Sequence, residues 1–122
     1  MLARTLVLLG VAVVLLAGCG PQTLAQQSKS LKAVAAEGGL LAGDAARGSS
    51  TTVFTREHTG FLLKAAAASA SSLAKETSAE GRRLARVAAR VRDDLQRLQQ
   101  SGSNRDVQRE VQHDLDRIAK RL

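Results

Sequence analysis

The chain has 122 residues, 18 of them basic and 11 acidic, so its formal charge is +7. This length accommodates one domain and little more. A single cysteine excludes an internal disulfide, and two histidines exclude a multi-histidine metal site. With no tryptophan, no tyrosine and only two phenylalanines, a nucleic-acid platform of stacked aromatic rings is excluded as well. Alanine is the commonest residue, which favours closely packed helices.

The first twenty residues have the features of an export signal. Arg4 is the only charge ahead of an apolar run from Leu6 to Gly18. A helix of those 13 residues would be about 20 Å long, whereas the hydrocarbon core of a bilayer is about 30 Å thick. A basic start, a short apolar stretch and small residues at its end are typical of a secretory signal peptide.

The end of this segment, Leu16-Ala17-Gly18-Cys19, resembles the lipobox of bacterial lipoproteins. The resemblance covers only the targeting segment. It implies that a diacylglycerol is attached to the Cys19 sulfur and that residues 1–18 are removed, which leaves Cys19 as the first residue. Residues 19–22 would then be the lipidated cysteine and a short tether that holds the domain close to the membrane. Two alternatives stay open, namely a plain signal peptide with a coincidental cysteine and a retained membrane helix.

Residues 23–122 are predicted to form a helical domain with breaks at clusters of Gly, Ser, Thr and Asn. The predicted helices cover residues 23–46, 52–76, 79–100 and 104–122. We therefore expect an all-α fold, a small antiparallel four-helix bundle with Ala-rich packing. The alternative is a pair of helical hairpins that share a bent central helix.

Local signals mark two helix starts and one uncertain break. The third segment is expected to start after Thr77 or Ser78. Thr77 is followed three residues later by Glu80, and Ser103 by Asp106, which is the spacing of an N-terminal capping box. The boundary at Gly81 is the weakest of the breaks, so a bent helix that joins the second and third segments through Gly81 is an alternative there.

The third and fourth segments have clear apolar stripes. Apolar residues in the third alternate spacings of four and three, which is a heptad seam, and those in the fourth follow the helical period. The stripe of the third segment is Leu84, Ala88, Val91, Leu95 and Leu98, and that of the fourth is Val107, Val111, Leu115, Ile118 and Leu122. We expect both stripes in the core.

The first two segments have small residues on their apolar faces. Their stripes are Leu24, Leu31, Ala35, Gly38, Ala42 and Ala45 in the first, and Phe54, Phe61, Ala65 and Ala68 in the second. If the loop at 48–51 closes an antiparallel hairpin, Phe54 lies over Ala45 and Phe61 over Gly38. Large residues placed on small ones keep a close interface filled.

No pattern in the chain predicts catalysis. Glu110 and His113 have the spacing found in di-iron bundles, but no second such pair exists, and His113 points away from the apolar stripe of its segment. The serines lack a nucleophile elbow, and no phosphate-binding loop is present. We expect no enzyme activity, no cofactor and no metal.

Glu57 and His58 lie at the edges of the Phe54/Phe61 stripe. One interpretation is a partly buried histidine that senses protons or contacts a ligand. The other is a histidine on the flank of a helix, bonded to a glutamate or to the backbone.

Five arginines and no acidic residue fall within residues 82–92. Across an antiparallel hairpin, Arg90 is expected to pair with Asp114 and Arg97 with Asp106, which would set the register of the two helices. Three arginines are left in excess as candidates for binding an anionic ligand: Arg82, Arg86 and Arg92.

These features predict a lipoprotein on the extracytoplasmic side of the cell membrane or the outer membrane. Its expected role is structural or a protein interaction at the bacterial cell envelope, with an envelope protein or a second copy as partner. The alternative is a module that binds an anionic lipid surface or an anionic envelope polymer through the surplus arginines. Nucleic acid is excluded as a partner because the chain is exported and has no base-reading motif.

Overall fold

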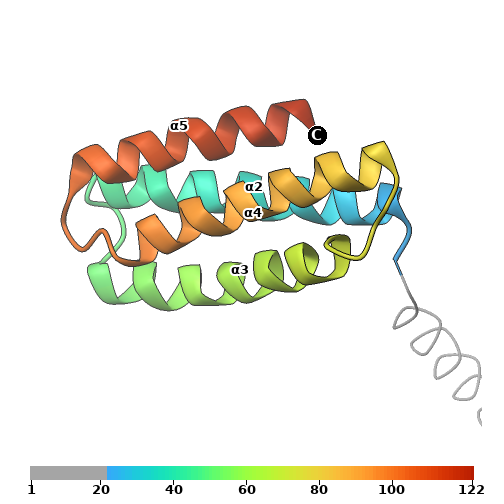
Figure 1. The fold of residues 1–122 in the computed structure, drawn as a ribbon. Coiled ribbons are helices and arrows are strands. Elements are labelled where there is room, and N and C mark those ends of the chain that lie inside the picture. The colour runs from blue at the N-terminus through green and yellow to red at the C-terminus, as the bar shows by residue number, and fades with distance from the viewer. Residues whose placement is uncertain (1–21) are drawn as a thin grey trace, which may run out of the picture.

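A computed structural model describes residues 22–122, which contain four α-helices and no strand. The helices are α2 (Leu24–Ala46), α3 (Thr52–Leu73), α4 (Ala79–Gln99) and α5 (Arg105–Arg121). They form a four-helix bundle in which successive helices run in opposite directions (Figure 1). The predicted all-α class and the antiparallel bundle are confirmed, and each helix begins and ends within three residues of its predicted range.

Each helix begins after a residue whose side chain accepts a hydrogen bond from the backbone N–H three residues on, a group without a partner inside the helix. The cap residues are Thr23, Thr51, Ser78 and Asn104. The Asn104 side chain accepts from Val107 at 3.2 Å, so the expected cap of α5 at Ser103 is wrong. The residue next to Ser103 offers an equally good acceptor, and the helix begins one position later.

The connection between α3 and α4 is a complete break. Residues 74–78 separate the two helices, so the alternative of one helix bent at Gly81 is wrong. Gly81 lies in the first turn of α4 and is buried. A Cβ atom at this position would lie 2.5 Å from the Glu76 Cβ, so glycine allows the connecting loop to fold back closely onto the helix.

The closest packing in the bundle is between α2 and α5, and between α3 and α4. Gly39 and Gly43, one turn apart on α2, both face α5. A Cβ at Gly39 would meet the carboxylate of Asp116, and one at Gly43 would lie 2.7 Å from the Gln112 amide nitrogen. The small face of α2 therefore lets the polar flank of α5 lie against its backbone.

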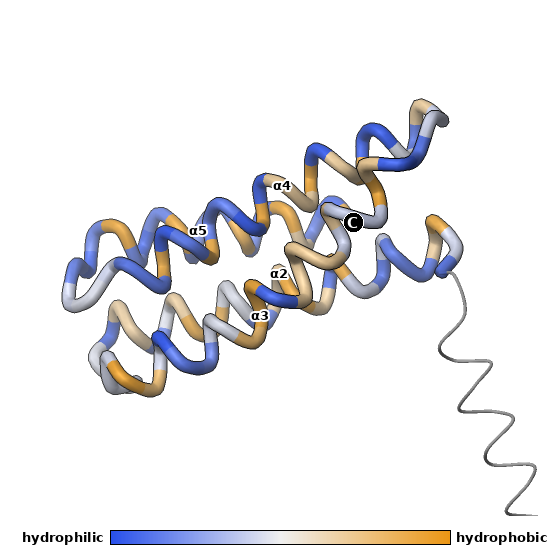
Figure 2. The backbone as a smooth tube through the Cα atoms, turned by 60° about the horizontal axis from the view of Figure 1, so that its bottom comes forward, coloured by the Kyte–Doolittle hydropathy of each residue, from blue (hydrophilic) through white to orange (hydrophobic). Residues whose placement is uncertain are grey.

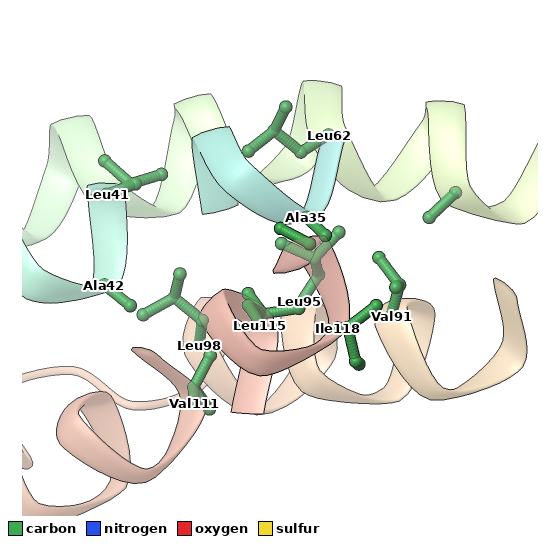
Figure 3. Close-up of a cluster of buried hydrophobic side chains, with 12 residues drawn as sticks. Ala35, Leu41, Ala42, Leu62, Val91, Leu95, Leu98, Val111, Leu115 and Ile118 are labelled. Carbon is green, nitrogen blue, oxygen red and sulfur yellow. The ribbon is translucent and has the colours of Figure 1, made fainter. Parts of the chain in front are cut away.

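The apolar stripes of α4 and α5 lie in the core as predicted, except that Val107 and Leu122 at the two ends of the α5 stripe are only partly buried. Figure 3 shows Val91, Leu95 and Leu98 of α4 together with Val111 and Leu115 of α5, and all five are at most 1% exposed. In Figure 2, α4 and α5 are largely hydrophilic with hydrophobic residues at helical intervals. A second cluster lies toward the start of α2 and contains Leu31, Leu73, Leu84 and Ala88.

The predicted packing of the first hairpin is wrong. Phe54 and Phe61 are 55% and 71% exposed, so they do not cover Ala45 and Gly38. The space over Gly38 is filled from α5 and α4, because a Cβ there would lie 2.9 Å from Leu115 Cδ1 and 3.0 Å from Leu95 Cδ2. The buried residues of α3 are Thr55, Thr59, Leu62, Ala66 and Leu73. The helix turns this face to the core because its main neighbour is α4, not α2.

Candidate functional site

The predicted lipidation site, Cys19, lies outside the described residues, as does the export segment. Lipidation of Cys19 stays a prediction from the sequence. Between Gln22 and Leu122, none of the helices is long and apolar enough to cross a bilayer. The chain joins α2 at the end of the bundle that also carries the loop between α3 and α4 (Figure 1).

Charge is unevenly distributed along the bundle. The Arg90–Asp114 pair marks the middle of the α4–α5 hairpin, so the half in which α2 begins comprises residues 22–35, 65–90 and 114–122. This half carries ten basic and four acidic side chains, a formal +6. The other half, residues 36–64 and 91–113, carries seven basic and seven acidic side chains, a formal charge of zero. The first half is called the basic end below.

The three surplus arginines do not form one site. Arg82 and Arg86 are exposed on α4 in the basic end, and neither makes an ion pair with another residue in 22–122. Arg92 lies in the other half, and its Nη2 is 3.5 Å from Asp93 Oδ1. The basic end therefore contains two of the three predicted anion-binding residues.

The two expected pairs between α4 and α5 have different outcomes. Arg90 donates from Nε to Asp114 at 3.0 Å and also from Nη2, as predicted. Arg97 donates to Glu110 at 2.7 Å, so the predicted Arg97–Asp106 pair is wrong. The register of the hairpin places Glu110, one turn beyond Asp106, opposite Arg97.

Asp94 is a buried carboxyl that was not among the site residues predicted from the sequence. Its side chain is 8% exposed, its Oδ1 lies 3.8 Å from Arg97, and its Oδ2 has no hydrogen-bond partner in the described part of the chain. Burial raises the pKa of Asp94 to about 8, and so does the neighbouring Asp114 carboxylate, because only a protonated Asp94 can donate a hydrogen bond to it. The sequence contains a signal for the burial of Asp94. The residue is three positions after Val91 and four before Leu98, so it lies beside the heptad seam of α4.

The pKa of Asp114 is shifted in the opposite direction from that of Asp94. Burial opposes its ionisation, but the hydrogen bonds from Asp94 and Arg90 outweigh burial and lower the pKa of Asp114. The two carboxyls therefore divide one charge, with the proton on Asp94 and the negative charge on Asp114 facing Arg90.

Glu57 and His58 have separate environments. The His58 Nε2 lies 2.8 Å from Glu37 Oε1 on α2, and its ring stacks on Phe54 with centroids 5.5 Å apart. This contact matches the interpretation of His58 as a helix-flank histidine bonded to a glutamate. Glu57 is exposed and points to the outer side of α3.

The outer side of α3 carries an apolar surface with a hollow in it. The hollow has a volume of about 330 Å³ and is lined by Glu57, Gly60, Phe61 and Lys64. We call this surface, with Phe54 and Ala68 at its two ends, the α3 face. Its two phenylalanines are among the most exposed large apolar side chains of the described chain. The helical period did not predict this surface, because it places both phenylalanines on an apolar stripe that would face the core.

A second, polar hollow lies at the end opposite the basic end, between the loops that join α2 to α3 and α4 to α5. It has a volume of about 140 Å³, and Ser50, Ser103, Arg105 and Gln108 are among its lining residues. The Gln108 amide donates to Gly102 O at 2.9 Å, while its Oε1 is buried without a partner among residues 22–122.

Glu110 and His113 are exposed, and Glu110 is engaged by Arg97. The described residues contain no group of three or more His, Cys, Asp and Glu side chains that could hold a metal ion.

No protein-family model, no curated protein and no solved structure matches this chain.

Proposed function

We propose that this protein is a bacterial lipoprotein, anchored through Cys19 on the extracytoplasmic side of the cell membrane or the outer membrane. In this proposal the helical bundle has a structural or protein-interaction role at the cell envelope and no catalytic role. The lipobox-like sequence that ends at Cys19 supports the anchor.

The observation that carries the interaction role is the α3 face. Two phenylalanines, 55% and 71% exposed, lie on the side of α3 opposite its buried residues. Large apolar side chains exposed together on one face of a helix are a mark of a protein-binding site. Aromatic side chains are also enriched where proteins bind one another.

Site-specific photo-crosslinking in living bacteria tests this role. A photoreactive residue is placed at position 61 of the full chain, and at position 109 as a control, because Arg109 is exposed on α5 away from the α3 face. We expect protein adducts from position 61 and few from position 109. Equal or absent adducts at both positions would contradict an interaction through the α3 face.

The second candidate function is binding of an anionic surface by the basic end. Its formal charge of +6, with Arg82 and Arg86 outside any ion pair of the described chain, favours contact with phospholipid headgroups or a phosphate-rich polymer. Since the chain joins α2 at this end, the anchor would hold the basic end close to the membrane.

A further inference from the structure

The hollow on α3 has the geometry of a hole in a coiled coil. Its four lining residues, Glu57, Gly60, Phe61 and Lys64, are spaced i, i+3, i+4 and i+7 along the helix. In coiled coils, a side chain of the facing helix inserts between four residues with this spacing. Because Gly60 has no side chain, the hollow is wide beside the Phe61 ring, and it lies on the solvent side of α3.

We propose that the α3 face binds the α3 face of a second copy of this chain, in antiparallel orientation, with Phe61 of each copy in the hollow of the other. This inference rests on the proposed interaction role and names the partner. A two-fold axis close to Phe61 relates the two copies, so every contact across the interface is made twice.

The charges of the α3 face select the antiparallel orientation. With Phe61 next to the axis, Glu57 of one copy faces Lys64 of the other, and Lys64 of the first faces Glu57 of the second. A parallel pair would instead place Glu57 against Glu57 and Lys64 against Lys64, and like charges directly opposite one another disfavour association.

Side-chain size fits the same register. One heptad from Phe61 in each direction are Phe54 and Ala68, both exposed. In the antiparallel pair, Phe54 of one copy therefore lies over Ala68 of the other. A large ring over a small residue allows the two helices to stay close along the whole contact.

The test uses two differently tagged full chains produced in the same bacterium. The membranes are solubilised in a mild non-ionic detergent, one tag is captured, and the amount of the other tag is measured. Wild-type chains are expected to co-purify. Phe61→Ala and Glu57→Lys should each lower the co-purified amount by roughly tenfold or more. Arg56→Glu is the matched control, because Arg56 is exposed on α3 outside the α3 face, and it should have no effect.

A charge exchange tests the register itself. A chain with both Glu57→Lys and Lys64→Glu is expected to co-purify with itself but not with the wild-type chain, since only identical copies then place opposite charges together. Absence of co-purification between wild-type chains, or co-purification that Phe61→Ala leaves unchanged, would overturn the second copy as partner. Failure of the exchanged chain to bind itself would overturn the antiparallel register.

Two readouts keep these outcomes separable. The replaced side chains are exposed, so the helix content of each variant, measured by circular dichroism at 25 °C, should match that of the wild type. Membrane fractionation of the same cells reports the anchor. If the chain fractionates with membranes and photo-crosslinks from position 61 to a different protein, the proposed function stands and the second copy is wrong as partner.

Discussion

Arg90 on α4 donates two hydrogen bonds to the carboxylate of Asp114 on α5, 24 residues further along the chain. This pair fixes the charged side of the α4–α5 hairpin, and it stabilises the ionised form of Asp114 beside Asp94, which keeps its proton up to about pH 8. The contact has a direct consequence for the dependence of stability on pH.

Asp94 should make the bundle less stable as the pH rises. Folding raises the pKa of Asp94 from 3.8 to about 8, so its contribution to the free energy of unfolding is complete below about pH 4 and is lost as the pH rises to about 8. The lowered pKa of Asp114 works the other way, and its contribution is lost only as the solution becomes acidic, below its ordinary pKa of 3.8. We expect a higher Tm near pH 5 than near pH 9.

The variant Asp94→Asn should abolish this difference, because asparagine is neutral at both pH values and still has a donor for Asp114. We expect the free energy of unfolding near pH 9 to rise by about 1 kcal/mol, which corresponds to roughly 4–8 °C in Tm for a domain of this size. Asp93→Asn is the control, since that side chain is 64% exposed, and it should leave the pH dependence in place. Equal wild-type melting temperatures at the two pH values would refute the assignment.

Both glycines at positions 38 and 39 should resist replacement. Gly38 faces Leu115 and Leu95, and Gly39 faces Asp116, so Gly38→Leu and Gly39→Leu each force α5 away from α2. We expect each variant to lower the free energy of unfolding by about 1–3 kcal/mol. Gly60→Ala is the contrasting case: the nearest atom to its new Cβ is at 3.5 Å, and alanine should add about 0.5–1 kcal/mol of stability to the helix. Denaturant unfolding of the three variants measures these changes in the free energy of unfolding. A Gly38→Leu variant as stable as the wild type would contradict the packing of Gly38 against Leu115 and Leu95.

Removal of the Cys19 thiol should release the protein from membranes or leave an uncleaved precursor. The change is Cys19→Ser, and the measurement is labelling with a radioactive fatty acid together with membrane fractionation. Because a serine hydroxyl does not accept the diacylglycerol, label and membrane association should both be lost. Unchanged labelling and fractionation would rule out Cys19 as the anchor.

The basic end should determine any attraction to anionic vesicles. Arg82→Gln with Arg86→Gln removes two charges at the basic end, and Arg105→Gln with Arg109→Gln removes two at the other end. An arginine close to an anionic surface contributes about 1 kcal/mol to the free energy of binding. Only the first pair of substitutions should therefore strongly weaken co-sedimentation of the unlipidated domain with anionic vesicles, and added salt should weaken it further. Arg92→Gln, in the other half of the bundle, should have little effect. Vesicles of neutral lipid are the control, and no wild-type binding at low salt would end this candidate function.

Much of the fold was predictable because α4 and α5 carry large apolar residues at helical spacing on otherwise polar helices. Leu84 to Leu98 can be buried along only one face, and that face is in the core. The Arg90–Asp114 pair followed from the same register. The turns were predictable because Gly48 and Gly102, both with positive φ, fall where the periodicity stops.

The orientation of α3 was not predictable, because its composition allows two buried faces. Phe54 and Phe61 define one face, and the residues around Leu62 define the other. Hydrophobicity favours the first, but the helix buries the second, which includes Thr59, whose hydroxyl donates to the backbone carbonyl of Thr55. This internal hydrogen bond satisfies a polar group that periodicity alone treats as unsuited to the core.

If Cys19 carries the proposed anchor and two copies pair through the α3 face, the position at which the chain joins α2 limits how they can meet. In an antiparallel pair, the two chains leave the dimer at opposite ends. Two copies anchored in one leaflet can then pair only if both bundles lie flat, with their helix axes along the membrane plane. A bundle that stands upright on its basic end can pair in this way only with a copy anchored in a facing membrane. Two neighbouring copies in the same leaflet therefore cannot both stand upright and pair through the α3 face.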